Sequence, residues 1–289
     1  MINRLIIPIL LVLAVVFGAQ GAAATIAGPE KDSTEMTDTV KQHDVIVEIE
    51  TTEGPIKVLL YGDTPAHQAN FLKLAGEGFY DGVLFHRVIK DFMVQTGDPD
   101  SKNAAPGQHL GSGDPGYTLE AEILYPKHYH KYGALAAART GDAVNPERRS
   151  SGSQFYIVTG QKQNPRAIEQ GEMRMANDVK QKYWMKLMKE NASKIKELQA
   201  AGDRDALEEF RRQLIDQLEA EVEVPELPQQ LKDDYINLGG TPHLDNQYTV
   251  FGEVIEGMDT VEKIQNVETD ASDRPLEDVK VLSVKVIEK

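Results

Sequence analysis

The sequence contains no cysteine among its 289 residues. This absence excludes disulfides, zinc ribbons, iron–sulfur clusters and thiol nucleophiles, because each of them requires a cysteine sulfur. Positive charge is also scarce: 31 Lys and Arg stand against 46 Asp and Glu, and the formal net charge is −15. Such an acidic chain argues against general binding to a phosphate backbone, so we expect no nucleic-acid partner.

Long hydrophobic runs are absent except at the N-terminus. Residues 1–24 place Arg4 before an apolar run and end in small residues, which is the pattern of a secretory signal peptide. The run is about 14 residues long, shorter than the roughly 20 needed to cross a bilayer, so a retained membrane anchor is the less favoured alternative. We therefore expect an exported protein, periplasmic or secreted, with no stable membrane insertion after cleavage. Residues 25–43 are polar and without apolar periodicity, and we expect a flexible tether there.

Short strands dominate the pattern after residue 44. Apolar and polar residues alternate over 45–50, and a second run over 56–61 follows a Gly-Pro turn, which together predict a β-hairpin. Thr64 and Pro65 are typical of a helix start. Further strands are predicted over 83–89, 92–95, 133–138, 154–158, 249–255 and 279–287, and a second short helix over 258–267. Many short strands with Gly-rich loops and two small helices indicate a mainly β fold, a closed antiparallel barrel.

Residues 162–240 have a different, helical pattern. Apolar residues recur every three or four positions over 173–188 and again over 207–218, as on one face of a helix. Residues 200–203 would form the turn between them, and Pro225 and Pro228 would end the pattern. We predict two amphipathic helices that pack as an αα-hairpin.

Six motifs occur in a fixed order on either side of this helical block. They are Phe85-His86-Arg87-Val88-Ile89, Phe92-Met93-Val94-Gln95, Gly97-Asp98, Gly152-Ser153-Gln154-Phe155-Tyr156-Ile157, Leu244-Asp245 and Val250-Phe251-Gly252. Together they resemble the cyclophilin family of peptidyl-prolyl cis–trans isomerases, over 45–161 and 241–287. The resemblance implies an eight-stranded antiparallel barrel capped by two helices. The barrel would comprise residues 44–161 and 241–289, and residues 162–240 would be an inserted helical hairpin.

The resemblance implies that the substrate is a proline-containing polypeptide, unfolded or exposed, and that no cofactor or metal is required. Arg87 matches the family's catalytic arginine, whereas without the motif it would be read as a surface ion-pair residue. Rotation about an X–Pro bond breaks amide resonance and gives the prolyl nitrogen a lone pair, so a fixed donor binds the twisted state better than the planar one. The positions implied to bind substrate are Phe92, Met93, Gln95, Ala138, Arg139, Gln154, Tyr156, His243, Leu244 and Tyr248.

Four of these residues depart from the family's usual choice. Tyr156 replaces Phe in the apolar proline pocket and adds a hydroxyl that needs a partner. Arg139 stands where an Asn is common, and we expect the change to be tolerated because the family uses only the backbone there. His243 replaces a Trp of the groove, which should weaken cyclosporin-type binding more than catalysis, and Tyr248 replaces a His.

Two further signals leave alternatives open. His128 and His130 could form half of a metal site, but no other ligand cluster accompanies them in the sequence. The helical block is rich in Met and aromatic residues, so it could bind clients or a partner as a chaperone, with weak or no catalysis. The alternative is that these residues pack the two helices together. They are Met173, Met175, Tyr183, Trp184, Met185 and Met188.

Overall fold

A computed structural model of the chain describes residues 43–224 and 226–288. The predicted signal peptide and all but the last residue of the predicted tether lie outside these residues. None of the helices in the described part is long and apolar enough to cross a bilayer.

The first two strands form the predicted hairpin. β1 (Val45–Thr51) pairs with β2 (Gly54–Leu60) along their whole length, and Gly54 closes the turn with a φ of 128° that favours glycine. Burial alternates residue by residue in β1, because successive side chains of a strand point to opposite faces.

Eight strands form one antiparallel sheet in the order β10-β1-β2-β9-β6-β8-β4-β3. The other strands of this sheet are β3 (Arg87–Ile89), β4 (Met93–Thr96), β6 (Ala134–Ala137), β8 (Phe155–Val158), β9 (Val250–Glu256) and β10 (Val281–Glu288). The sheet curls, because the segment before β3 bonds to the start of β10. Phe85 N–H donates to Val279 O at 2.9 Å, and Gly82 N–H donates to Val281 O at 2.8 Å. The predicted eight-stranded antiparallel fold is confirmed.

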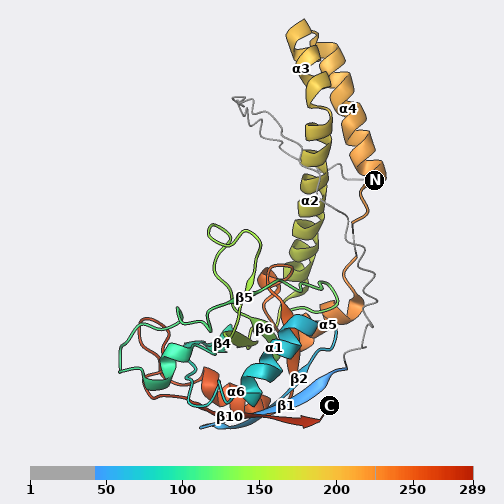
Figure 1. The fold of residues 1–289 in the computed structure, drawn as a ribbon. Helices are drawn as coiled ribbons and strands as arrows, with labels where there is room; N and C mark the ends of the chain where they lie inside the picture. Colours follow the sequence, from blue (N-terminus) through green and yellow to red (C-terminus); the bar gives the residue numbers. More distant parts are fainter. Residues whose placement is uncertain (1–42, 225, 289) are drawn as a thin grey trace, which may run out of the picture. The chain divides into compact units, whose positions relative to one another are not determined.

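Two helices cover the sheet (Figure 1). α1 (Pro65–Gly76) buries Phe71 and Leu74, and α6 (Met258–Gln265) buries Val261 and Ile264. These side chains join the interior cluster formed by one face of the strands. Short elements elsewhere are η1 (Pro99–Asn103), η2 (Pro242–Leu244) and a two-stranded sheet of β5 (Thr118–Leu119) with β7 (Ser150–Ser151).

The central strands carry a second apolar cluster on their other face. Every residue of β6 and β8 is buried, so these strands pack on both sides of the sheet. This outer-face cluster consists of Met93, Ala134, Ala136, Tyr156, Val158 and Val250.

The segment predicted to be a two-helix hairpin contains four helices: α2 (Pro165–Glu190), α3 (Ala192–Ala201), α4 (Arg204–Glu221) and α5 (Gln229–Asn237). Gly202, with a φ of 70°, lies in the turn between α3 and α4, within the predicted turn 200–203. The expectation that Pro228 ends the helical pattern is wrong, because Pro228 is the N-cap of α5. Proline is tolerated at a helix start, where its missing N–H would have no intrahelical partner.

The long helices α2 and α4 contact each other (Figure 1). Each of them buries leucine side chains: Leu187 in α2, and Leu214 and Leu218 in α4. α5 and the start of α2 pack on the connection before β6. That cluster contains Ile168, Leu227, Leu231 and Tyr235, with Tyr125 and Tyr129 against it.

The two ends of this helical segment meet at a pair of glycines. Gly240 N–H donates to Gly160 O at 2.9 Å. A Cβ on Gly160 would lie 2.3 Å from Gly240 O, so only glycine allows this approach. The segment therefore leaves the sheet after β8 and returns beside the same point.

Candidate active site

One row of side chains crosses four neighbouring strands of the sheet. Arg87 of β3 lies opposite Gln95 of β4, Gln95 opposite Tyr156 of β8, and Tyr156 opposite Ala136 of β6. Side chains directly opposite each other in an antiparallel pair project from the same face. The row therefore places the cation, an amide and an aromatic ring together on the outer face.

The apolar residues of the predicted pocket gather beside this row. Met93 and Tyr156 are buried in the outer-face cluster, and Phe92, Leu244 and Tyr248 are half-buried against it. Ala138, at the end of β6, also contacts this cluster. Ala134, Ala136 and Val158 of this cluster were not predicted from the sequence. Alternation along the strands could have identified them, because each lies an even number of positions from Ala138 or Tyr156, which are predicted pocket residues on the same strands or directly after them.

A chain of amides connects Arg87 to a glycine-rich loop. Arg87 Nη1 donates to Gln95 Oε1 at 3.5 Å, and Gln95 Nε2 donates to Gln154 Oε1 at 3.0 Å. Gln154 Nε2 donates in turn to the carbonyls of Gly111 and Gly113, at 3.0 and 2.7 Å. These bonds hold both amides in one orientation. The Arg87 side chain is 42% exposed, with Asp273 Oδ2 at 3.7 Å from its Nε, so a ligand can reach the guanidinium.

His86 precedes Arg87 in the same motif but is buried. Burial lowers the pKa of its imidazole to about 4, so His86 is neutral at physiological pH. The positive charge at this point of the site therefore belongs to Arg87.

The Tyr156 hydroxyl has a buried partner. It lies 3.0 Å from His130 Nε2, and His130 Nδ1 lies 3.0 Å from Asp245 Oδ1. Burial raises the pKa of Tyr156 well above its usual value, so the hydroxyl keeps its proton. The partner expected for this hydroxyl from the sequence is thus a histidine, which the sequence analysis considered only as a metal ligand.

The two histidines of the possible half metal site have separate partners. His128 Nε2 lies 2.7 Å from Asp63 Oδ1, and its ring stacks on Tyr61 with 4.0 Å between centroids. His130 is bound to Asp245 instead. Across residues 43–224 and 226–288, no group of three or more His, Asp or Glu side chains is arranged to hold a metal.

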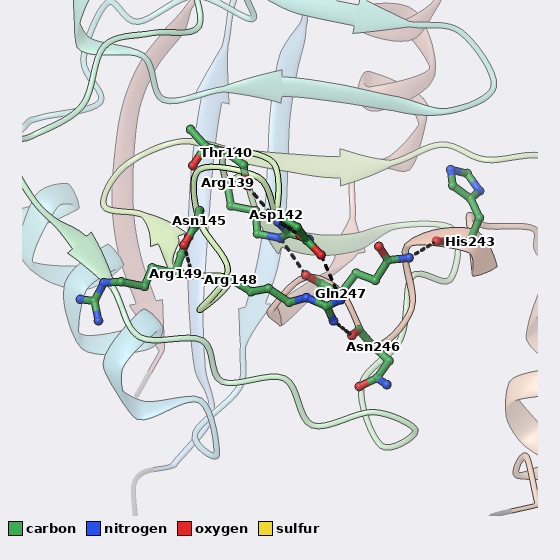
Figure 2. Close-up of polar contacts among 9 residues, drawn as sticks. All are labelled: Arg139, Thr140, Asp142, Asn145, Arg148, Arg149, His243, Asn246 and Gln247. Carbon is green, nitrogen blue, oxygen red and sulfur yellow. Dashed lines mark hydrogen bonds and ion pairs between the residues drawn. The ribbon is translucent and has the colours of Figure 1, made fainter. Parts of the chain in front are cut away.

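The loop after β6 is fastened to the loop after η2 by arginines (Figure 2). The Arg139 side chain is only 3% exposed: its Nε donates to Gln247 O at 2.9 Å, and its Cζ lies 4.5 Å from the centroid of the Tyr248 ring. Arg148 Nη1 donates to Asn246 O at 2.8 Å, and Asp142 accepts from both arginines. Only the backbone of Arg139 was expected to matter, whereas its side chain contacts Tyr248, another departure from the family pattern.

His243 lies at the rim of the pocket. Its ring stacks on Phe92, with 5.6 Å between centroids and 21° between planes. Partial burial lowers the pKa of His243, so its neutral form is favoured. The imidazole thus covers one side of Phe92 as a flat neutral ring.

Comparisons with known proteins identify the family. The family model for "Cyclophilin type peptidyl-prolyl cis-trans isomerase/CLD" matches residues 46–179 and 233–286, together more than half of the chain. The chain belongs to the cyclophilin-type peptidyl-prolyl cis–trans isomerases. The family predicted from the six motifs is confirmed, and with it the activity: this cyclophilin is a peptidyl-prolyl cis–trans isomerase.

Curated relatives of this cyclophilin share most of its length. A relative from Staphylococcus haemolyticus, whose name assigns it to the peptidyl-prolyl cis–trans isomerases, is 30% identical over 253 residues, 86% of this chain and 95% of the relative. One from Staphylococcus epidermidis is 31% identical over 251 residues, with the same coverage. A crystal structure of a Cryptosporidium parvum cyclophilin type isomerase has a TM-score of 0.49 and 20% identity, covering 85% of this chain and 99% of that one.

Replacing Arg139 by Asn, the residue common in the family, tests how far its contacts between the loop after β6 and the loop after η2 stabilise the fold. Arg139→Asn removes a buried charged donor and the stacking on Tyr248, so we expect a loss of about 2 kcal/mol in the free energy of unfolding, measured in urea. Arg149→Asn is the matched control in the same loop, because Arg149 bonds to Thr118 and not to the loop after η2. We expect its loss to stay below about 1 kcal/mol. Equal decreases in the free energy of unfolding in the two variants would mean that the contact of Arg139 with Tyr248 does not stabilise the fold.

Proposed function

We propose that this cyclophilin accelerates X–Pro isomerisation by binding the twisted amide beside Arg87. The proline ring would lie in an apolar pocket whose floor is formed by Met93 and Tyr156. The observation that carries the proposal is the row of Arg87, Gln95 and Tyr156 on one face of three paired strands. This row supports the proposal because it puts the cation of Arg87 on the same face as the apolar surface that would accept a proline ring.

The chemistry requires only binding that favours the twisted state. The planar amide delocalises the nitrogen lone pair, and the barrier of about 18–20 kcal/mol reflects the loss of that resonance. In the twisted state the prolyl nitrogen becomes a hydrogen-bond acceptor, and the guanidinium of Arg87 can donate to it. A donor that is held in place before the reaction stabilises this state without reorganising.

Other residues would hold the peptide in register. The half-buried amide of Gln95 is oriented by its bond to Gln154, which leaves it preorganised toward a substrate backbone. Both Nε2 hydrogens of the buried Gln154 are bound to the Gly111 and Gly113 carbonyls, so Gln154 would act by holding Gln95. Phe92, Leu244 and Tyr248 border the pocket and would bury the proline ring. Substrates would be unfolded or exposed proline-containing segments of polypeptides.

Loss of the guanidinium tests the mechanism. We expect Arg87→Ala to lower kcat/KM on a proline tetrapeptide at least about tenfold, through kcat more than KM, because the lost interaction forms mainly in the twisted state. Lys90→Ala is the matched control, because Lys90 is an exposed cation at the turn after β3. Activity that survives in Arg87→Ala at the level of Lys90→Ala would refute the mechanism.

We also propose that the isomerase acts on exported proteins. The support is the signal-peptide pattern of residues 1–24. When the full chain is expressed in a secreting bacterium, N-terminal sequencing of the exported protein should find that it starts close after Ala24. A product that retains Met1 would contradict cleavage and would favour the anchor alternative.

A second candidate function is partner or client binding through the helices between β8 and η2. Met173 and Met185 of α2 are 51% and 64% exposed, whereas Leu187 of α2 and Leu214 and Leu218 of α4 are buried. More than half of each of these two methionine side chains is therefore open to a partner. Exposed, flexible Met side chains suit binding to varied apolar partners.

Polar replacement of the two methionines tests this second function. We expect the double variant Met173→Gln with Met185→Gln to bind an unfolded client about fivefold more weakly, because two apolar contacts are lost. Its isomerase activity on a tetrapeptide should not change. Lys189→Gln on the same exposed helix is the control. Client affinity equal to that of the control variant would eliminate a role for this surface.

A further inference from the structure

A continuous chain of hydrogen bonds leads from the floor of the proline pocket to helix α5. It begins at Tyr156, passes through His130 and Asp245, and ends at Tyr235, with separations of 3.0, 3.0 and 2.7 Å. Tyr156 belongs to β8 of the sheet and Tyr235 to α5 of the inserted segment. The chain therefore joins the site to helix α5, which has no role in the proposed isomerase mechanism.

The direction of the bonds to Asp245 follows from the chemistry of the groups. Asp245 has two oxygens that accept: the Tyr235 hydroxyl donates to Oδ2, and the His130 backbone N–H donates to Oδ1 at 2.9 Å. His130 Nδ1 faces the same Oδ1 and must carry a proton to bond to it. The other ring nitrogen, Nε2, makes the hydrogen bond to the Tyr156 hydroxyl, and the direction of that bond depends on the tautomer of the ring.

Burial makes this chain sensitive to the loss of any member. Tyr235 and His130 are almost fully buried, and the Asp245 side chain is only 8% exposed. A buried carboxylate is costly unless donors surround it, and here three donors do. Removing one donor leaves the carboxylate partly unpaired, and it would shift toward other partners. His130 would move with it, because two of the three bonds come from His130.

Asp245 also links the chain to a wall of the pocket. It directly follows Leu244 at the end of η2, and α2 contacts η2 as well. A shift of Asp245 would thus reach the pocket at two points, its floor through His130 and its wall through Leu244.

We propose that Tyr235 and Asp245 are positioning residues for the proline pocket and act through His130 on the Tyr156 hydroxyl. The docking of α5 thereby sets how tightly the pocket holds a proline ring. This inference rests on the proposed function, because it takes Tyr156 as the pocket floor. The hydroxyl that completes the chain is the atom that Tyr156 adds to the family's usual Phe.

The experiment compares Tyr235→Phe with the wild-type protein on a tetrapeptide that contains Ala-Pro. The substitution removes one hydroxyl and keeps the ring in its packing. We expect KM to rise about fivefold, at the low end of coupling between sites, with kcat changed less than about twofold. The pocket floor contacts the proline ring in the planar and the twisted state alike, so its disturbance should change KM and not kcat.

A second background tests the route. In Tyr156→Phe the chain no longer reaches the pocket floor, and only the wall at Leu244 still follows Asp245. Adding Tyr235→Phe should therefore raise KM less than about twofold further. An equal rise in both backgrounds would overturn the route through His130. An unchanged KM in Tyr235→Phe alone would overturn the inference as a whole.

The matched control is Tyr129→Phe. Tyr129 packs on Tyr235 with 5.6 Å between centroids, and its hydroxyl donates to Asp234 of α5 at 2.6 Å, so it loses a similar bond to the same helix. We expect its KM to equal that of the wild type, and a rise equal to that in Tyr235→Phe would assign the effect to general loosening of α5. Arg87→Ala distinguishes a failure of the coupling from a failure of the proposed function. If Arg87→Ala loses activity and Tyr235→Phe has a normal KM, only the coupling is refuted. If Arg87→Ala keeps full activity, the proposed function itself is refuted.

Discussion

Burial on both faces of the central strands is the constraint on which the rest of this structure depends. β6 and β8 have no exposed position, because one set of alternate residues faces the interior cluster and the other set faces the outer-face cluster. The interior set, such as Leu135 and Ile157, packs against α1 and α6 and stabilises the fold. The outer set, such as Ala136 and Tyr156, floors the proposed pocket. One strand segment therefore supports stability and the site together, and a change of register by one residue would destroy both.

The polar groups around the pocket are held by their own partners before any substrate arrives. Gln95 and Gln154 bond to each other, and the loop after η2 is fastened by Arg139 and Arg148. Two departures from the family pattern, Arg139 and Tyr248, contact each other through a cation–π interaction. A third departure, Tyr156, has acquired His130 as the partner of its hydroxyl. Each of these three departures thus has a local partner in the structure.

The helical segment between β8 and η2 adds residues without disturbing the sheet, because its two ends meet at Gly160 and Gly240. Its first and last helices pack on the connection before β6, while α2 and α4 bury leucines between them. The coupling proposed for Tyr235 places the last of these helices next to the chemistry of the pocket. The exposed methionines of α2 belong to the same segment, and α2 contacts both α5 and η2.

The sequence by itself determined the strand-rich body, its two covering helices and the family, because these depend on local alternation, turn residues and short motifs. It predicted β1 and β2 closely, but β3 begins only at Arg87 although a strand is predicted from residue 83. The reason is that residues 82–85 pair with residues 279–281 only at one isolated bridge, Leu84 to Lys280, which is too short to extend the strand. Helix α5 was missed because Pro228 reads as an end in the sequence and serves as a cap in the structure. Only the tertiary structure decided that His130 bonds to Tyr156 and that the Arg139 side chain covers Tyr248, because these partners lie 26 and 109 positions apart in the chain and meet only when the sheet curls.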